Sequence, residues 1–511
     1  MGTESVAGFF GVAMAYRGLD DRAPTPLCPI VVTPAHEVAE IARPEAARAL
    51  EAHARRARGL AAARGVAAEA LRSLFSSYLL LDLLGHLAIL PLVGKILTPH
   101  LFAAIARRAG GLLLPAVPTS VAIDAADPGD VAPSGRRRGF TIVEQADRIA
   151  GTLRAMGIVR GLAPLVVLLG HGSISENNPH LSAYDCGACG GKHGGPNARA
   201  FAAMANRPAV RAALRERGID IPDDTWFVGG EHNTADDSIA YHDLADVPAS
   251  HGDALRRLAA DLATAAAWSA HERCRRFASA PRDPTPDRAL RHVVGRTGDF
   301  SQARPELGHV TNACAVVGRR AATRGVFLDR RAFLVSYDPA EDPEGKVLEG
   351  VLLAVGPVGA GINLEYYFST VDNAVYGCGT KVPHNVCGLI GVLEGGQGDL
   401  RTGLPRQMIE IHEPVRLQLI VEAKPAVLAA IYGRQAPLRK LIGNGWAHLI
   451  SMDPDSGELA VFHPRGEFVA WERPPAELPV VPASSAWYRG KTDFLAPALI
   501  ARRRAPEVAR A

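Results

Sequence analysis

A short apolar run that ends in a histidine constrains the fold of this 511-residue chain more than any other feature. Residues 163–170 read Ala-Pro-Leu-Val-Val-Leu-Leu-Gly, and His171 follows directly. A short, continuously apolar, β-branched segment is typical of a strand buried in a parallel sheet. Ligands of open α/β sheets collect at the carboxyl ends of such strands, so His171 stands where a site is expected.

The segments around this run alternate between helical and strand patterns. Helices are expected at 44–76, 143–156, 197–217 and 251–277, and strands at 226–230, 332–337, 347–355, 416–421, 447–450 and 459–462. The predicted class is α/β, with a mostly parallel sheet, flanking helices and a strand-rich C-terminal region. We divide the chain into residues 1–245, with an apolar helical insertion near 44–120, and an α+β region at 246–511.

Composition excludes several classes of protein. Hydrophobic residues make up 48% and charged residues 21%, so the chain is not disordered. A net charge of +3 is too small and too dispersed to predict nucleic-acid binding, and the arginine-rich tail at 502–504 is interpreted as a solvated end. Seven scattered cysteines do not form a disulfide framework, and the first residues lack the pattern of a secretory signal. These features predict a reducing compartment, the cytoplasm.

Residues 77–97 raise the question of membrane contact. The segment has the roughly 20 residues of a membrane span, but Asp82, His86, Pro91 and Lys95 interrupt it. Each central charge costs about 3 kcal/mol on insertion scales. A buried core helix and a contact with a membrane partner are the two main interpretations, ahead of a true span.

The loop after His171 carries the strongest candidate chemistry. Residues 181–199 contain Cys186 in a glycine-rich setting with little side-chain bulk, which suits close approach to an ion. A thiolate and a neutral imidazole on neighbouring segments are donors that Zn²⁺ prefers in a tetrahedral site. His171 and Cys186 are therefore the predicted metal ligands, although zinc needs two further donors, or one and water.

Other residues of this loop have competing interpretations. Cys186 and Cys189 form a C-x-x-C, but a structural zinc ribbon needs a second pair, and a redox pair lacks its usual sequence context. His180 and His193 are interpreted as loop histidines facing solvent rather than as ligands. Asp185 is either a hydrogen-bond acceptor behind the metal or a turn residue.

A second polar loop follows the strand at 226–230. Its residues 229–237 read Gly-Gly-Glu-His-Asn-Thr-Ala-Asp-Asp, which supplies either the edge of a site or a polar turn that caps a helix. Ser173 lies too close to His171 in sequence for a nucleophile and base, so a serine hydrolase is not favoured.

The motifs around His171 and Cys186 resemble those of the DabA family, the large peripheral subunits of bacterial two-component inorganic carbon transporters. The similar segments occur in family order over nearly the whole chain, at residues 7–17, 171–179, 182–191, 196–199, 301–306, 331–338, 362–373, 381–386, 399–407 and 412–417. The resemblance implies a β-carbonic-anhydrase-like core in which zinc is held by two Cys, one Asp and one His.

In this resemblance the His and the second Cys correspond to His171 and Cys186. The first Cys and the Asp belong to a C-x-D-x-R-S-E strand upstream of the motif that spans Gly8–Gly11 here, and no cysteine of this chain begins such a strand. The resemblance thus implies a C-terminal portion of a DabA protein. The missing donors come either from a separate upstream polypeptide or from a sequence before a misassigned start, and the chain alone is expected to bind zinc weakly.

The function implied by the resemblance is one-way hydration of CO2 to bicarbonate. The expected partner is a DabB-like cation-conducting membrane subunit, with residues 77–97 as the contact, and the expected place is the cytoplasmic face of the cell inner membrane. Carbonic-anhydrase-like activity is expected only in the complex. The alternatives are an autonomous cytoplasmic zinc hydrolase and a truncated or split remnant without metal.

Overall fold

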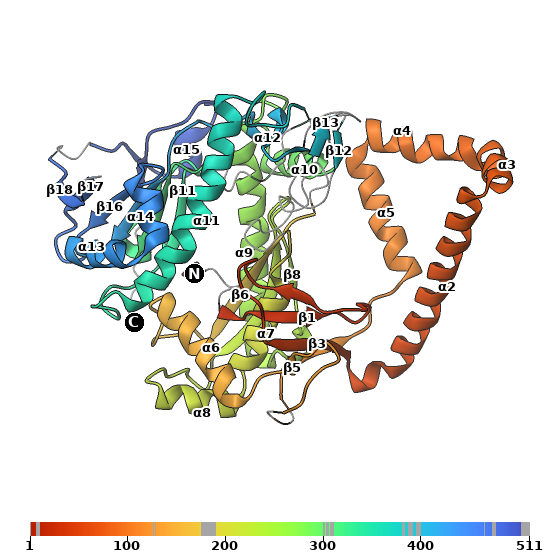
Figure 1. The fold of residues 1–511 in the computed structure, drawn as a ribbon, viewed down its shortest axis with the longest axis horizontal. Coiled ribbons are helices and arrows are strands. Elements are labelled where there is room, and N and C mark those ends of the chain that lie inside the picture. Colours follow the sequence, from red (N-terminus) through yellow and green to blue (C-terminus); the bar gives the residue numbers. More distant parts are fainter. Residues whose placement is uncertain are drawn as a thin grey trace, which may run out of the picture.

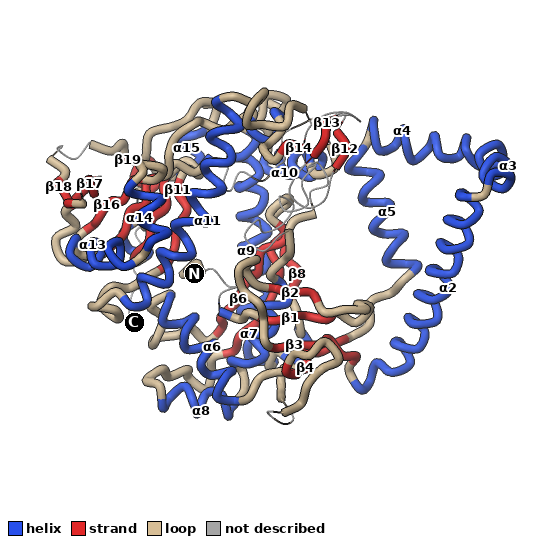
Figure 2. The backbone as a smooth tube through the Cα atoms, viewed as in Figure 1, coloured by secondary structure: helices blue, strands red, loops and turns tan. Residues whose placement is uncertain are grey.

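The fold was analysed in a computed structural model of residues 1–511. The structure describes residues 2–6, 11–125, 127, 129–174, 191–299, 302, 306, 311–380, 384–386, 392–394, 400–463, 466–472 and 477–501. These residues form a mixed α/β body from which a frame of helices projects to one side (Figures 1 and 2).

A mixed sheet lies at the N-terminal end of the described chain. Its strand order is β2-β1-β3-β4, and a short strand β5 pairs with β3. β1 and β3 are parallel, whereas β2 and β4 are antiparallel to their neighbours. The strands are β1 (Met14–Arg17), β2 (Thr25–Leu27), β3 (His36–Ala42), β4 (Thr119–Ala122) and β5 (Arg137–Arg138).

The strand predicted to end at His171 belongs to a second sheet. β6 (Leu165–Gly172) pairs in parallel with β7 (Trp226–Asn233), which pairs antiparallel with β8 (Ser238–Tyr241). Three helices pack with this sheet: α6 (Ile142–Ala155), α7 (Gly195–Ala205) and α8 (Pro208–Glu216). α6 begins with a capping box, in which Thr141 and Glu144 satisfy each other's backbone N–H groups. The helices and the two sheets share one core, which includes Met14, Ile149 and Phe227.

The projecting frame, which we call the arm, spans residues 44–113. It consists of η1 (Pro44–Ala46), α2 (Ala47–Arg72), α3 (Leu74–Leu84), η2 (Gly85–Ala88), α4 (Ile89–Leu97) and α5 (Pro99–Leu113). α2 and α5 form two legs, and the apolar helices between them form the far end (Figure 1). α3 has no buried residue, and Leu74 and Phe75 are 80% and 83% exposed. The expectation of a buried core helix at 77–97 is therefore wrong for this chain.

The C-terminal region is built on a six-stranded sheet of order β11-β9-β15-β16-β17-β18. The first four strands are parallel, and β17 and β18 are antiparallel additions. The strands of the sheet are β9 (Cys314–Gly318), β11 (Ala332–Ser336), β15 (Gln418–Glu422), β16 (His448–Met452), β17 (Leu459–His463) and β18 (Glu467–Ala470).

The rest of residues 244–501 forms helices and small sheets. The helices are η5 (Leu244–Asp246), α9 (Ala249–Cys274), α10 (Pro286–Arg296), η7 (Arg320–Ala322), α11 (Lys346–Val371), α12 (Arg406–Ile409), α13 (Pro425–Arg434), α14 (Ala436–Gly443) and α15 (Ser484–Tyr488). The small sheets are β10 (Val326–Phe327), β20 (Ala498–Ile500) and β19 (Val480–Val481), and β12 (His384–Val386), β13 (Val392–Glu394) and β14 (Leu400–Arg401). Among the described helices, α11 is the one long and apolar enough to cross a membrane by length and composition. Here one of its faces packs on the C-terminal core through Leu348 and Leu352.

Two expectations about the fold need correction. The sheets are not mostly parallel, because every sheet in the described part of the chain contains at least one antiparallel pair. Residues 347–355, predicted as a strand, lie in α11, where Leu348, Leu352 and Val355 are buried at helical spacing. The other predicted helices and strands are present, with shifted bounds.

Candidate functional site

β6 and β7 carry their polar residues at the same end. Their parallel register places Gly170 opposite Glu231, His171 opposite His232, and Gly172 opposite Asn233. Both strands are apolar toward their beginnings, and the polar residues stand at their carboxyl ends, where ligands of α/β sheets gather. His171 is thus the next-to-last residue of the strand itself rather than the first residue of a loop.

Glycines allow the start of α7 to lie directly against the end of β6. A Cβ on Gly170 would lie 2.1 Å from the carbonyl oxygen of Gly194, and a Cβ on Gly172 would lie 2.7 Å from Oε1 of Glu231. The backbone N–H of Gly194 donates to the carbonyl of His171 at 2.7 Å. This close approach requires residues without side chains, and it places the start of α7 beside His171.

The imidazole of His171 contacts a hydroxyl from the second polar loop. Its Nε2 lies 3.3 Å from Oγ1 of Thr234. Thr234 is itself held by its backbone N–H, which donates to the carbonyl of Gly172 at 2.8 Å. The segment 229–237 therefore forms the edge of the candidate site, one of the two interpretations of its sequence, and Thr234 positions His171.

A buried ion pair holds the turn at residues 234–237 in place. Arg273 of α9 is 1% exposed, and its guanidinium donates to Oδ2 of Asp237 at 2.6 Å and to the carbonyls of Thr234 and Ala235 at 3.3 Å. The other carboxylate oxygen of Asp237 lies 2.9 Å from Nε2 of His232. Burial alone would raise the pKa of Asp237, but the hydrogen bond with His232 and the charge of Arg273 lower that pKa to about 2.

Glu231 and His193 form a second pair beside His171. The imidazole of His193 contacts the carboxylate of Glu231, and the His193 side chain is 50% exposed. Burial acts to raise the pKa of Glu231, but the hydrogen bond and charge of His193 hold it below its usual value. An ionised Glu231 therefore stands between the start of α7 and the end of β6.

One carboxylate at this site was not predicted from the sequence. The hydroxyl of Ser173 donates to Oε1 of Glu306, which is 8% exposed. The other oxygen of Glu306, Oε2, is buried without a hydrogen-bond partner among the described residues. Glu306 ends the segment 301–306, whose family-like sequence was the one available signal, although nothing in it predicted contact with Ser173.

The arginine of the segment 196–199 connects the site to the first sheet. Arg199 donates to Glu40 of β3 at 2.9 Å, to Asp243 at 2.6 Å, and to the carbonyl of Thr119 at 2.7 Å. Burial and the carboxylate of Glu40 raise the pKa of the neighbouring Tyr16 to about 12. α7, which begins beside His171, is thereby fixed to β3 and β4.

Part of the predicted site lies outside the described residues, namely His180, Asp185, Cys186 and Cys189. Within the described part of the chain, no group of three or more His, Cys, Asp or Glu side chains is arranged to hold a metal ion. The pairing of His171 with Cys186 therefore stays a prediction.

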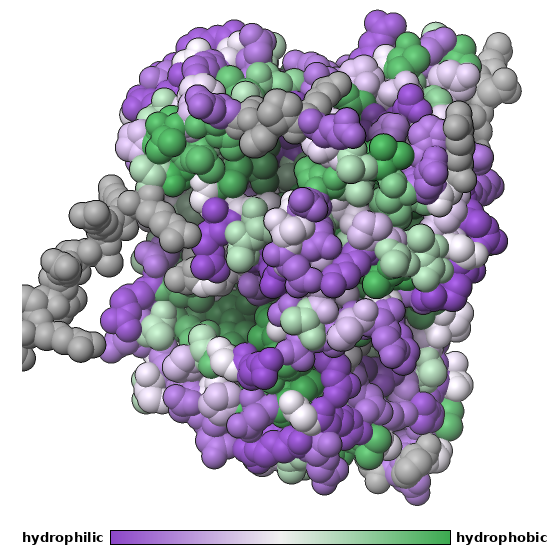
Figure 3. Space-filling view, turned by 90° about the vertical axis from the view of Figure 1, so that its left-hand side faces the viewer, coloured by the Kyte–Doolittle hydropathy of each residue, from purple (hydrophilic) through white to green (hydrophobic). Residues whose placement is uncertain are grey.

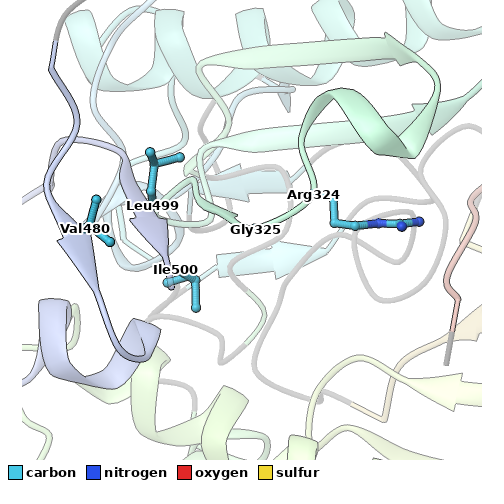
Figure 4. Close-up of a pocket in the computed structure, with 5 residues that line it drawn as sticks. All are labelled: Arg324, Gly325, Val480, Leu499 and Ile500. Carbon is cyan, nitrogen blue, oxygen red and sulfur yellow. The ribbon is translucent and has the colours of Figure 1, made fainter. Parts of the chain in front are cut away.

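A pocket on another sheet offers little chemistry. It is lined by Arg324, Gly325, Val480, Leu499 and Ile500, and the Arg324 side chain points away from the three aliphatic ones (Figure 4). It contains no carboxylate, imidazole or thiol, so the end of β6 is the stronger candidate.

Comparison with known protein families shows which family this chain belongs to. Residues 1–447 match the family described as "Probable inorganic carbon transporter subunit DabA". The chain belongs to the DabA family. A DabA relative from Methylococcus capsulatus is 56% identical over 98% of this chain and 47% of its own length. Relatives from Sorangium cellulosum and Nitrosococcus oceani, described in the same words, are 55% and 50% identical over 98% of the chain and cover 48% and 46% of their own lengths.

The comparisons also show how much of each relative's length this chain covers. It spans about half the length of the DabA relatives it matches. No solved structure matches it. The family resemblance read from the motifs is confirmed.

Proposed function

We propose that this DabA chain is the zinc-binding part of a peripheral subunit of an energy-coupled inorganic carbon transporter, which converts CO2 to bicarbonate in one direction. The observation that carries the proposal is His171 at the carboxyl end of β6, held by Thr234, in a chain of the DabA family. Both halves of the proposal are needed, because family membership supplies the substrate class and β6 supplies the place.

The proposed zinc ligands within this chain are His171 and Cys186. The described residues alone do not supply a complete set of zinc ligands. The side chain that contacts His171 is that of Thr234, and no group of three His, Cys, Asp or Glu side chains in the described part of the chain is arranged to hold a metal ion. The remaining donors would come from a polypeptide segment outside these 511 residues, in a core resembling that of β-carbonic anhydrases. Zinc bound there would lower the pKa of a coordinated water toward about 7 and so favour attack on CO2.

The chain's own residues then have separate tasks. Thr234 keeps the ring of His171 oriented, and the Arg273–Asp237–His232 group keeps the turn that carries Thr234 in place. Ionised Glu231, in contact with His193, places a negative charge at the carboxyl ends of β6 and β7.

The arm supports association of the subunit with a membrane, which we propose to be the cytoplasmic face of the inner membrane. Its far end exposes a run of large apolar side chains, among them Leu74, Phe75, Tyr78, Leu79, Leu81, Leu83, Leu84, Leu90 and Leu97. Exposed apolar patches of this kind mark protein or membrane contacts. We therefore infer that residues 77–97 contact the cation-conducting membrane subunit.

The proposed division of the chain is a site region at 1–245 and an α+β region at 246–511. It agrees with the separation of the core around Phe227 from the core around Leu419.

Zinc analysis tests the proposal. We expect less than one zinc per chain when the chain is expressed alone, and close to one when it is co-expressed with the half of a DabA relative that the match leaves out. His171→Ala should abolish zinc binding and carbon uptake in that assembly and leave the circular dichroism spectrum unchanged. His251→Ala is the matched control, because its imidazole contacts the backbone carbonyl of Asp224 and belongs neither to the proposed ligands nor to the groups around His171. Full zinc occupancy in His171→Ala would refute the site.

A further inference from the structure

We propose that His53 is a proton-dependent latch that fixes α2, the first leg of the arm, to the body of the protein. With two protons on its imidazole ring the latch is closed, and with one proton it loosens and frees α2. The latch depends only on contacts within this chain. It rests on the proposed function in one respect, that the arm whose position it controls contacts the membrane subunit.

α2 has a single buried side chain. All 26 residues of the helix are described, and His53 is the one that is buried, with 7% of its surface exposed. Figure 1 shows the helix at the outer side of the arm, where it leaves the body near its first turns. His53 lies in the second turn, so a contact there sets the direction of the roughly 28 Å of helix that follow. Aliphatic residues are buried far more often than histidine, so the choice of this residue calls for a chemical reason.

The ring of His53 joins three segments of the chain. Its Nδ1 lies 2.9 Å from the carbonyl oxygen of Pro115, which follows α5. Its Nε2 lies 2.9 Å from both carboxylate oxygens of Asp20, in the turn between β1 and β2. Because α2 and α5 are the two legs of the arm, the ring ties both legs to each other and to the first sheet.

The chemistry of these partners requires two protons on the ring. A carbonyl oxygen and an ionised carboxylate accept hydrogen bonds, and neither can donate one. A neutral imidazole has one N–H, so it satisfies one partner and turns a lone pair toward the other. The carbonyl of Pro115 and the carboxylate of Asp20 accordingly raise the pKa of His53 above its ordinary value of 6.5, against the opposing effect of burial.

The charge that faces the ring is that of Asp20. The other charged side chains on the elements around the ring are those of residues 21–22 in the same turn and of Arg56 on α2, and all of these residues are exposed. Residues 114–118, which follow α5, carry no charge. Protonation of the ring is therefore governed by one carboxylate and one carbonyl.

The other attachments of the arm do not depend on this proton. Arg43, just before the arm, donates to the carbonyl of Thr119 at 3.0 Å and to Asp246 at 2.7 Å, and its guanidinium stays charged. The second leg, α5, lies beside α10. Loss of the proton therefore frees α2 while the root of the arm and α5 stay attached.

The direction of the pH dependence follows from the raised pKa. The contact is complete below about pH 6.5 and is lost as the pH rises through the higher pKa of His53 in the folded protein. An alkaline cytoplasm would thus change how the arm presents its apolar far end to the membrane subunit.

Hydrogen exchange of the full chain tests the latch, because a helix with so few tertiary contacts is protected only while it is attached. The variant His53→Gln is neutral at every pH. We expect the amides of residues 47–58 to exchange about tenfold faster in this variant than in wild type at about pH 6, and within about twofold of wild type at about pH 9. Comparing variant and wild type at the same pH removes the intrinsic dependence of exchange on hydroxide.

The variant Asp20→Asn separates a proton switch from a merely structural contact. The new amide can donate to an unprotonated Nε2 while Nδ1 keeps its N–H for Pro115, so a neutral His53 then makes both contacts. We expect α2 to stay protected at about pH 9 in this variant, with exchange about tenfold slower than in wild type. His86→Gln, the same substitution at an exposed histidine of the arm, is the matched control and should exchange like wild type at both pH values.

The wild-type protein alone provides a second measurement, which does not depend on the folding of any variant. Exchange at residues 47–58, divided by exchange in α13 and α14 on the side of the body shown in Figure 3, should rise about tenfold between about pH 6 and about pH 9. A ratio that stays constant, or exchange in Asp20→Asn as fast as in wild type at about pH 9, would overturn the latch. A pH-dependent α2 in a chain that binds neither zinc nor the membrane subunit would instead refute the proposed function and leave the latch intact.

Discussion

Neutralising Asp237 should destabilise the turn that positions His171, and the size of the effect follows from its ionisation. The usual pKa of an aspartate is 3.8, and the hydrogen bond with His232 and the charge of Arg273 lower that of Asp237 to about 2 against the opposing effect of burial. At about 1.4 kcal/mol for each tenfold change in the ionisation constant, this depression corresponds to about 2.5 kcal/mol of folded-state stability. The side chain is 15% exposed, so solvent screening removes little of it.

The variant Asp237→Asn isolates the charge. Asp237 has a φ of 59°, a conformation that asparagine tolerates, so the backbone turn should survive. We expect the free energy of unfolding, measured by urea denaturation at pH 7, to fall by about 2–3 kcal/mol. Because the folded-state pKa is depressed, the contribution is complete well above pH 4 and disappears as the pH falls toward 2. The gap between variant and wild type should therefore be about halved at pH 3.

The control for this measurement is Asp223→Asn, since Asp223 is 93% exposed in its ion pair with Arg215. That variant should unfold like wild type. A loss below about 0.5 kcal/mol in Asp237→Asn, or a gap between variant and wild type that stays constant between pH 7 and pH 3, would refute the charge-based account of the turn.

Two further predictions concern the packing of the site and the arm. Gly170→Ala should lower the free energy of unfolding by several kcal/mol, because its Cβ would lie 2.1 Å from the Gly194 carbonyl oxygen. Gly151→Ala in α6 is the control, since its Cβ would have no atom within 4 Å, and it should be neutral or stabilising in thermal unfolding. Equal melting temperatures of the two variants would contradict this packing. The double variant Leu79→Ser/Leu90→Ser should keep the wild-type melting temperature, because both side chains are more than half exposed, and should lower recovery with membranes that contain the cation-conducting subunit at least tenfold. Ala61→Ser on α2 is the control for the arm, and undiminished recovery of the leucine variant would exclude these side chains from the contact.

The sequence predicted the local structure near His171 well because the signals there are local. The apolar run before Gly170 and the glycines that precede α7 each specify their own conformation. The apolar run at 347–355 was wrongly predicted to be a strand, because alternating and helical periodicity are hard to distinguish in short apolar segments. Its place in α11 is decided by packing in a core that also contains residues of β9, β15 and α14, which are distant in the sequence.

Contacts that depend on distant segments were beyond sequence reasoning. The approach of Glu306 to Ser173 joins residues 133 positions apart, and the burial of Arg273 under Asp237 joins α9 to the second polar loop. For residues 77–97 the sequence left a buried core helix and a partner contact both open, and only the tertiary structure shows that most of their large apolar side chains are exposed. The motif resemblance identified the family, because strings of residues can be matched without knowledge of packing.

Coupling between a membrane partner and the site, which the proposed function requires, has a continuous physical route in this fold. The two ends of the arm join β3 and β4, where Arg43 donates to the carbonyl of Thr119 at 3.0 Å and to Asp243 at 3.1 Å. Arg199 of α7 contacts the same carbonyl and the same carboxylate. α7 begins at Gly195, and the preceding Gly194 donates to the backbone of His171.

A displacement of the arm would therefore act on Thr119 and Asp243, both of which also hold α7. At Gly170 and Gly172 the start of α7 and the end of β6 are packed too closely for a side chain to lie between them. A shift of α7 therefore cannot be absorbed locally by a flexible side chain. We expect the same crowding that excludes a methyl group at Gly170 to transmit a displacement of the arm to the backbone at His171, whereas a loosely packed junction would not.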